Sequence, residues 1–200
     1  MKVYVVRHGE SESNAAGCYS GWSQVRLTEQ GRQDAMRAGQ LLKEIAIDRV
    51  YASDLPRAME TAQLALPGRE LELRPELREN HVGAFQDQPV AWCDAKYGQI
   101  SIQARKKRDF TPVGGENIAM VTERVSRFMK ELEALPPQST AAVFCHEWII
   151  KRMLACALDV PVETDRLWLG NGSVSAFSYQ DKWRLDSWNL CEKTHPSLFE

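Results

Sequence analysis

The chain has 200 residues, of which 44% are hydrophobic, and its formal net charge is −2 at pH 7. A chain of this length buries about 70% of its unfolded surface, so one domain over residues 1–200 is expected. The near-neutral charge gives no general attraction to nucleic acid or anionic membranes, and no apolar run approaches the roughly 20 residues of a membrane span. Neither nucleic acid nor a membrane is therefore expected as a partner, and any anion-binding site must be formed by a local cluster of charged residues.

The cysteines and the N-terminus both bear on the compartment. Five cysteines, an odd number, occur without CxxC spacing, and Cys145 and Cys156 stand in apolar surroundings as small core residues do. The apolar run before Arg7 is too short for a signal peptide. A reducing, cytoplasmic location is the expectation.

The first predicted element is a buried strand over residues 3–6, apolar on both faces and rich in β-branched residues. It ends at Arg7, His8 and Gly9, where a fixed cation and a titratable imidazole precede a residue that lets the backbone turn closely around a ligand. Residues 10–26 are polar and predicted to form a loop. Ligands of open α/β sheets bind outside the carboxyl ends of strands, so this junction predicts a site.

The next segments repeat the alternation of helix and strand. Thr28 is a predicted N-cap for an amphipathic helix, and a short strand follows over residues 50–52. Asp54 is expected to cap a second helix with Pro56 in its first turn. Arg57 therefore lies just inside that helix, at a second strand end.

The middle of the chain is harder to interpret. A third strand over residues 71–73 precedes Glu79. Residues 84–113 contain only isolated helical hints and are predicted to be an insertion that covers the substrate. Their basic run 105–108 has two open interpretations, a solvated helix face or a group at the substrate mouth that binds a second anionic group.

The last third contains the clearest periodicity. A long amphipathic helix opens after residues 114–117, and a buried strand over 141–145 delivers His146 at its end, just before an apolar helix. A hairpin closes the chain over residues 174–188. Strands that alternate with helices predict an α/β fold, a three-layer α/β/α sandwich with a largely parallel central sheet.

Three predicted strand ends carry groups of matching chemistry, namely Arg7 with His8, then Arg57, then His146. Two guanidiniums and two imidazoles around one point suit a tetrahedral dianion, because arginine can bind two oxygens at once. Histidine is a nucleophile when one ring nitrogen is unprotonated, and a carboxyl group screened from water can donate a proton near neutrality. Glu79 is the candidate acid, with Glu76 as its competitor, and the reaction predicted is phosphoryl transfer.

These residues resemble the histidine phosphatase superfamily, also called phosphoglycerate mutase-like, along nearly the whole chain. The motifs are Arg-His-Gly-Glu-Ser at 7–11 with Asn14, Ser-Gly-Trp at 20–22, Leu-Thr-Glu-Gln-Gly at 27–31, Ser-Asp-Leu-Pro-Arg-Ala at 53–58, Leu-Arg-Glu at 77–79, Gly-Gly-Glu at 114–116 and His146 after a strand.

The resemblance implies a role for each motif residue. His8 is implied as the phosphorylated nucleophile, in a phosphate pocket completed by Arg7, Arg57 and His146, with Glu79 as general acid and then base. Asn14, Ser20 and Gly21 fall where the family places further phosphate or substrate contacts. No cofactor and no metal is implied, and the four histidines lack ligand spacing.

Three departures from the family pattern keep alternatives open. Glu147 replaces the usual glycine after the second histidine and predicts weakened phosphate affinity, since a carboxylate there repels the substrate unless it points away. Gln24 stands in a segment that commonly has an acidic residue followed by proline. Asn80 and Val82 stand where glycolytic mutases carry an arginine and a tyrosine.

The preferred interpretation is a metal-independent phosphomonoesterase acting on a small-molecule phosphate ester. Chain length and residues 19–21 are similar to α-ribazole phosphatases and broad-specificity phosphatases. A phosphoglycerate mutase and a catalytically weak phospho-ligand binding protein are the alternatives. The oligomeric state is open, with a homodimer as the candidate assembly.

Overall fold

The computed structural model describes residues 1–160 and 167–191; His195, for which no role was expected, lies outside them. Six strands form one sheet in the order β3-β2-β4-β1-β5-β6. The strands are β1 (Lys2–Arg7), β2 (Arg49–Ala52), β3 (Glu72–Leu73), β4 (Thr140–Cys145), β5 (Val174–Tyr179) and β6 (Trp183–Leu190). The first four in sheet order are mutually parallel, and the closing hairpin is antiparallel to its neighbours. The predicted largely parallel α/β sheet is confirmed.

Seven α-helices occur in the described ranges. They are α1 (Glu12–Ala15), α2 (Glu29–Leu42), α3 (Pro56–Ala65), α4 (Val90–Tyr97), α5 (Gln99–Lys107), α6 (Ile118–Glu133) and α7 (Glu147–Leu158). The loop prediction for residues 10–26 is wrong at α1, a single turn closed by a capping box in which Ser11 and Asn14 bond each other. One turn is too short to show periodicity.

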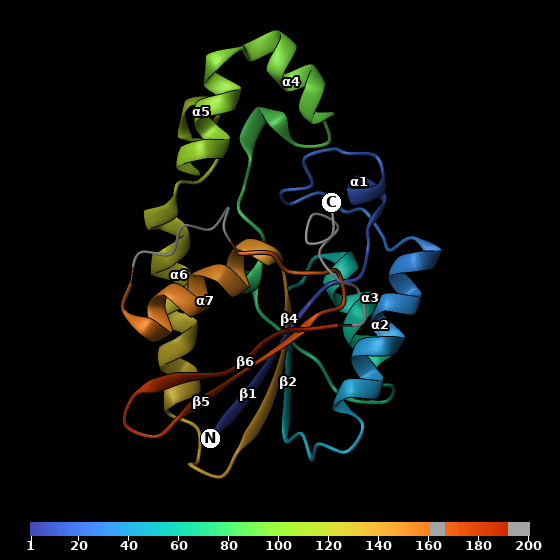
Figure 1. The fold of residues 1–200 in the computed structure, drawn as a ribbon, viewed down its shortest axis with the longest axis vertical. Coiled ribbons are helices and arrows are strands. Elements are labelled where there is room, and N and C mark those ends of the chain that lie inside the picture. Colours follow the sequence, from blue (N-terminus) through green and yellow to red (C-terminus); the bar gives the residue numbers. More distant parts are fainter. Residues whose placement is uncertain (161–166, 192–200) are drawn as a thin grey trace, which may run out of the picture.

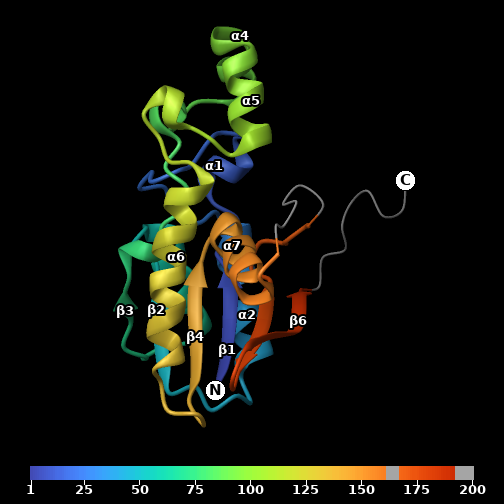
Figure 2. The same ribbon diagram turned by 90° about the vertical axis from the view of Figure 1, so that its left-hand side faces the viewer.

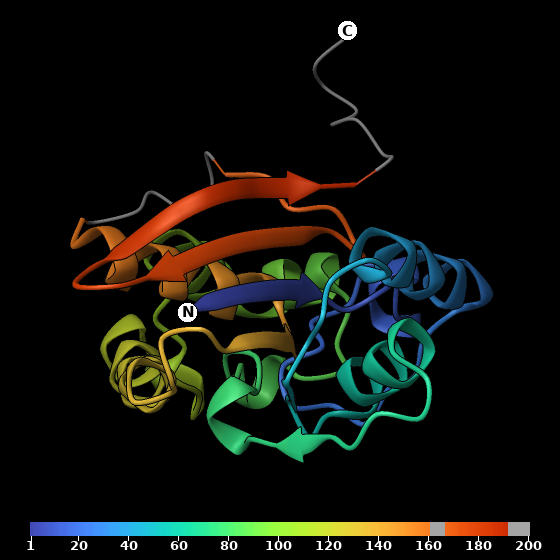
Figure 3. The ribbon, with the colours of Figure 1, turned by 90° about the horizontal axis from the view of Figure 1, so that it is seen from below.

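The pleat of the strands divides the core between the two faces of the sheet. Val5 and Val143 face α6 and α7, whereas Val6 and Phe144 face α2 and α3. Figure 3 shows these helices on opposite sides of the sheet. The result is the predicted three-layer sandwich, and the side-chain alternation fixes the strand register because a slip by one residue would exchange the two cores.

The helix that carries Arg57 begins differently from the prediction. Its N-cap is Leu55, which makes no side-chain capping bond, and Pro56 occupies the first turn as expected. Asp54 does not cap, because its carboxylate binds the Arg78 guanidinium through two bonds of 2.7 and 2.5 Å. A bidentate ion pair is stronger than a single capping bond to a neutral N–H, so the carboxylate turns to Arg78.

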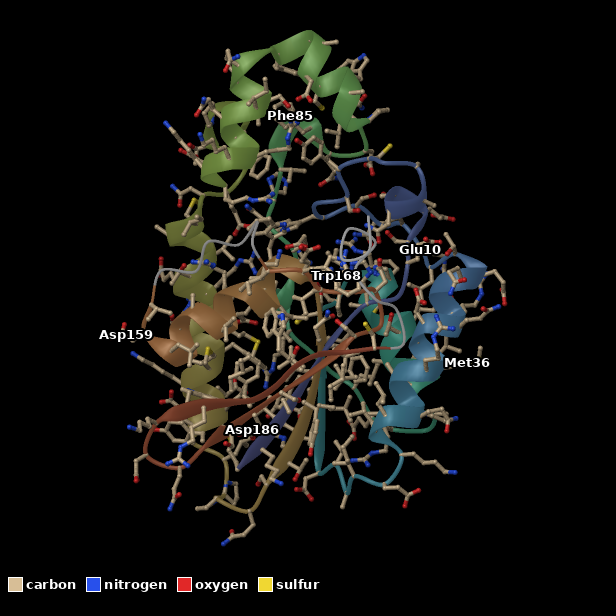
Figure 4. All side chains as sticks on the ribbon, in the orientation of Figure 1. Glu10, Met36, Phe85, Asp159, Trp168 and Asp186 are labelled. Carbon is tan, nitrogen blue, oxygen red and sulfur yellow. The ribbon has the colours of Figure 1, made fainter. Side chains whose placement is uncertain are left out.

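Residues 84–113 fold into α4 and α5, which stand above the carboxyl ends of the strands (Figures 1 and 2). They have a small hydrophobic cluster of their own around Phe85, Cys93 and Phe110, and Phe85 lies beneath these helices in Figure 4. Arg105 joins the two helices through its bonds to Asp94. The sequence hints therefore correspond to two real helices at the end of the sheet where a ligand is expected.

None of the helices that the structure describes has the length and apolar character needed to cross a membrane.

Candidate active site

A cavity of about 160 Å³ opens at the carboxyl ends of the parallel strands. It is lined by seven residues that the sequence singles out: Arg7, His8, Asn14, Ser20, Gly21, Arg57 and Glu79. His146 is fully buried behind this lining, with its ring centroid 5.1 Å from that of His8. The structure therefore brings every predicted site residue to one place. Glu76, the competitor of Glu79, does not line the cavity.

His8 is held in one protonation state. Its side chain is buried, and burial, then the charges of Arg57 and Arg7, lowers the pKa well below the ordinary value of 6.5. The imidazole is therefore neutral near pH 7. Its Nδ1 lies 2.6 Å from the Gly9 carbonyl oxygen, which can only accept, so Nδ1 carries the proton. The Nε2 lone pair is left for attack.

The backbone around His8 is fixed from distant segments. The Gly9 N–H donates to Thr61 Oγ1 at 3.1 Å, and Asn171 donates to the His8 carbonyl oxygen at 3.2 Å. Gly9 itself has a different role from the one predicted. A Cβ there would lie 2.1 Å from the Gly31 carbonyl oxygen, so the glycine permits close packing of α2 and not the approach of a ligand.

Arg57 is fully buried with both ends of its guanidinium anchored. Its terminal nitrogens donate to the carbonyl oxygens of Ser23 at 3.1 Å and Gly21 at 2.8 Å. Burial lowers the pKa of Arg57 to about 10, which still leaves it charged at neutral pH. Gly21, a predicted contact residue, and Ser23 therefore orient the arginine through their backbone carbonyl groups.

Ser53 fixes the orientation of the His146 ring. The Ser53 hydroxyl accepts the Leu55 N–H at 3.3 Å and forms a hydrogen bond of 2.9 Å with His146 Nε2. Burial, followed by the charge of Arg57, lowers the pKa of His146 well below its ordinary value. The ring is therefore neutral near pH 7.

Three buried nitrogens of this site have no hydrogen-bond partner among the described residues: Arg7 Nε, Arg57 Nε and His146 Nδ1. A buried donor without an acceptor costs about 1–3 kcal/mol, so native structures rarely leave several together. All three belong to groups that surround His8. The arrangement provides hydrogen-bonding nitrogens and positive charge that can hold a tetrahedral oxyanion beside His8.

Glu79 supplies a carboxyl group at the opposite wall. Its Oε1 accepts the Asn80 N–H at 2.9 Å. Burial raises the pKa of Glu79, and this effect outweighs the Asn80 N–H bond and the charge of Arg57, which lower it. The carboxyl group therefore keeps its proton to a higher pH than an exposed glutamate does, as a general acid requires.

Arg124 of α6 holds the Glu79 segment and is missed by the sequence reasoning. Its guanidinium donates to the carbonyl oxygens of residues 76, 78 and 79 and to both oxygens of Glu116. Glu116 also accepts the His81 N–H at 2.8 Å. A signal was present, because Arg124 lies at helical spacing between Val121 and Val125 on the buried stripe of α6.

Eight more residues line the cavity, of which the sequence analysis placed Glu147 and the basic run containing Arg108 near the substrate. The wall is completed by Cys18, Tyr19, Asn80, Val82, Arg108, Phe110, Glu147 and Trp148. The Arg108 guanidinium lies over the Trp148 ring, 3.1 Å from its centroid. Arg108 therefore lies in the cavity wall, as the interpretation of the basic run 105–108 as a group at the substrate mouth requires. Lys106 and Lys107 are exposed.

Glu147 does not point away from the cavity. Its carboxylate lies 3.2 Å from Arg7 and 2.5 Å from Lys151.

In residues 1–160 and 167–191, no group of three His, Cys, Asp or Glu side chains could hold a metal ion.

The sheet and the cavity together place a neutral histidine among buried hydrogen-bond donors and positive charge, an arrangement that can hold a tetrahedral oxyanion. The sequence model of the histidine phosphatase superfamily, branch 1, matches residues 3–191. The chain belongs to the histidine phosphatase superfamily and is a phosphatase.

Relatives of two kinds are similar to this chain. An adenosylcobalamin/alpha-ribazole phosphatase of Salmonella typhimurium is 31% identical in an alignment of 182 positions that covers 84% of this chain and 84% of that protein. A probable phosphoglycerate mutase of Photorhabdus laumondii is 32% identical in an alignment of 196 positions that covers 94% of this chain and 90% of that protein.

Solved structures agree with the family. The alpha-ribazole phosphatase from Shigella flexneri has a TM-score of 0.86 at 26% identity, covering 95% of this chain and 96% of its own. A mycobacterial glucosyl-3-phosphoglycerate phosphatase in complex with VO3 has a TM-score of 0.85 at 28% identity, covering 95% and 99%.

Proposed function

We propose that this phosphatase hydrolyses a small-molecule phosphomonoester through a phosphohistidine intermediate on His8, without a metal ion. The observation that carries the proposal is the neutral His8 imidazole, whose Nδ1 is committed to the Gly9 carbonyl oxygen, beside three buried nitrogens that have no hydrogen-bond partner among the described residues. A nucleophile whose proton is already placed needs no separate base for the first step.

In the first step, His8 Nε2 forms a bond to phosphorus while the bond from phosphorus to the ester oxygen breaks. Arg7, Arg57 and His146 donate to the non-bridging oxygens, where charge accumulates. Glu79 gives its proton to the departing oxygen, which leaves as an alcohol. The raised pKa of Glu79 supports this role, since it favours the protonated carboxyl group that the first step requires.

In the second step, water attacks the phosphorus of phospho-His8 and the bond from phosphorus to Nε2 breaks. Glu79, now a carboxylate, takes the proton of that water, so the acid of the first step is regenerated. The products are inorganic phosphate and the alcohol. Asn14, Ser20 and Gly21 line the same cavity and are proposed to contact the substrate.

The substrate is proposed from the relatives and the cavity wall. α-Ribazole phosphate is the first candidate, because α-ribazole phosphatases occur both among the sequence relatives and among the solved structures. Glucosyl-3-phosphoglycerate is the second, from the mycobacterial neighbour. Residues 84–113 are the proposed lid that distinguishes such substrates, since α4 and α5 stand over the cavity end of the sheet.

Mutase activity is the weaker alternative. Asn80 and Val82, which line the cavity, replace the arginine and tyrosine that the resemblance assigns to glycolytic mutases. Neither side chain can pair with a phosphoglycerate carboxylate as arginine does. An assay of 3-phosphoglycerate that measures phosphate release against isomerisation distinguishes the two. The cytoplasmic location and the homodimer stay predictions.

Rapid quenching with a ³²P-labelled substrate tests the intermediate directly. The expected result is an acid-labile, base-stable label on His8 that forms and decays at rates compatible with turnover. Normal hydrolysis with no label on His8 would overturn the proposal. Phosphate-ester binding without hydrolysis across a panel of phosphomonoesters would instead favour a binding protein.

A further inference from the structure

The Glu147 carboxylate lies in the cavity wall. It stands at the sequence position after His146, where the family pattern usually has glycine. Its two oxygens have different partners: Oε2 lies 3.2 Å from an Arg7 terminal nitrogen, and Oε1 accepts a hydrogen bond from Lys151 Nζ at 2.5 Å. Lys151 follows one turn later on α7, and only 3% of its side chain is exposed. The carboxylate thus bridges the phosphate pocket and a buried cation.

Lys151 changes the electrostatic effect of Glu147. A lone carboxylate in a phosphate pocket would repel the substrate, but the pair of Glu147 and Lys151 has no net charge. Burial raises the pKa of Glu147, yet Arg7 and Lys151 together hold it below the ordinary value, so Glu147 is a carboxylate at neutral pH. Burial lowers the pKa of Lys151, and the Glu147 charge and hydrogen bond oppose that effect. Repulsion of the phosphoryl group is thereby offset close to its source.

The same carboxylate completes the anchoring of Arg7. One terminal nitrogen of Arg7 donates to the Leu169 carbonyl oxygen, the other lies against Glu147, and Nε has no partner among the residues described. Because a guanidinium is planar and rigid, fixing both ends fixes the direction of the Nε–H bond. The nitrogen left without an acceptor is the one that the pocket needs for the phosphoryl oxygen.

We propose that Glu147, backed by Lys151, is a positioning residue that holds Arg7 with Nε directed at the phosphoryl group. The inference rests on the proposed function in one respect, the assignment of Arg7 to phosphate binding. It replaces the simpler expectation that Glu147 only weakens phosphate affinity. Arg57 offers an internal parallel, since two backbone carbonyl oxygens anchor its ends and again leave Nε without a partner.

Two double variants separate anchoring from charge. E147Q/K151M and E147A/K151M both remove one negative and one positive charge, so their net charge equals that of the natural chain. Only glutamine retains an oxygen that can accept from Arg7. We expect E147A/K151M to lose about tenfold in affinity for inorganic phosphate and in kcat/KM, the size of one charge-assisted hydrogen bond, and E147Q/K151M to stay within about threefold.

Isothermal titration with inorganic phosphate measures the affinity, and steady-state hydrolysis of p-nitrophenyl phosphate measures kcat/KM. Equal values for the two double variants would overturn the inference, as would tighter phosphate binding by E147A/K151M than by the natural chain. If the double variants do not fold, the single variants E147Q and E147A permit the same comparison, because their net charges are equal to each other. Phosphate binding needs no turnover, so failed hydrolysis by the natural chain would refute the proposed function while the affinities still test Glu147.

Discussion

The cavity has a floor and a roof of different construction. The floor consists of Arg7, His8, Arg57 and His146 at the strand ends, and the last three are at most 4% exposed. The roof consists of residues 84–113, whose apolar side chains Trp92, Ile100 and Ile102 are 41–49% exposed. Hydrogen bonds from several distant segments fix the floor, whereas the roof packs mainly on its own small cluster.

This difference assigns separate tasks to the two regions. Under the proposed function, the floor binds the phosphoryl group that is common to all phosphomonoesters. The roof, as the proposed lid, contacts the rest of the substrate. Loops and insertions on a rigid scaffold commonly determine specificity in this way. Changes in the floor should therefore affect every substrate, and changes in the roof should distinguish among substrates.

The largest effect is expected for His8→Ala. Removing the nucleophile should lower kcat by about 10⁴-fold or more for both aryl and alkyl phosphates, because no other group supplies the attacking atom. Initial rates with p-nitrophenyl phosphate and with an alkyl phosphate measure the loss. Unchanged thermal unfolding confirms that the fold is intact, and substantial turnover by His8→Ala would mean that the nucleophile lies elsewhere.

The second effect is expected for Glu79→Gln and depends on the leaving group. Alkyl phosphates, whose alkoxide leaves poorly, should slow by about 10²- to 10³-fold, and aryl phosphates by much less in the first step. Because the pKa of Glu79 is raised, kcat/KM for alkyl phosphates should fall as pH rises through that pKa. The variant should lack this alkaline fall. Equal losses for both ester classes would remove Glu79 from the role of acid.

The floor is far more predictable from the sequence than the roof. Three of the four floor residues come at the end of an apolar run, so the strand pattern alone places Arg7, His8 and His146 at one sheet edge, whereas Arg57 follows its strand by five residues, inside α3. Gly9 was correctly singled out but for the wrong reason, since its close neighbour Gly31 is 22 positions away in sequence and the contact is purely tertiary.

The helices of the roof give a weak signal because they lie over a cavity and not against a sheet. Neither α4 nor α5 buries a continuous apolar stripe, and the run 105–108 combines Arg105, paired with Asp94, with exposed lysines and with Arg108 in the cavity wall. The three-dimensional path of the chain determines which of four adjacent cations faces the substrate. Composition and periodicity do not contain that information.

Arg124 extends the floor toward the roof and should show an intermediate effect. Arg124→Gln removes the group that holds three carbonyl oxygens around Glu79 and leaves Glu116 without its buried cation. We expect about a tenfold loss of kcat and a loss of about 3 kcal/mol in the free energy of unfolding. Urea denaturation and steady-state kinetics measure the two effects.

Arg127→Gln is the matched control for Arg124, since Arg127 is exposed on the same helix. It should leave both quantities nearly unchanged. Equal effects of the two substitutions would show that the network around Arg124 does not position the Glu79 segment.

The smallest effect is expected in the roof, for Arg108→Met. This guanidinium lies over Trp148 in the cavity wall, where it can bind a second anionic group of the substrate. KM should rise about three- to tenfold more for phosphomonoesters with a second anionic group than for those without one. Lys106→Met, at an exposed position of α5, is the control and should not discriminate. An equal change in KM for both substrate classes would mean that Arg108 binds the phosphoryl group, as the floor residues are proposed to do. The division of tasks between floor and roof would then not extend to Arg108.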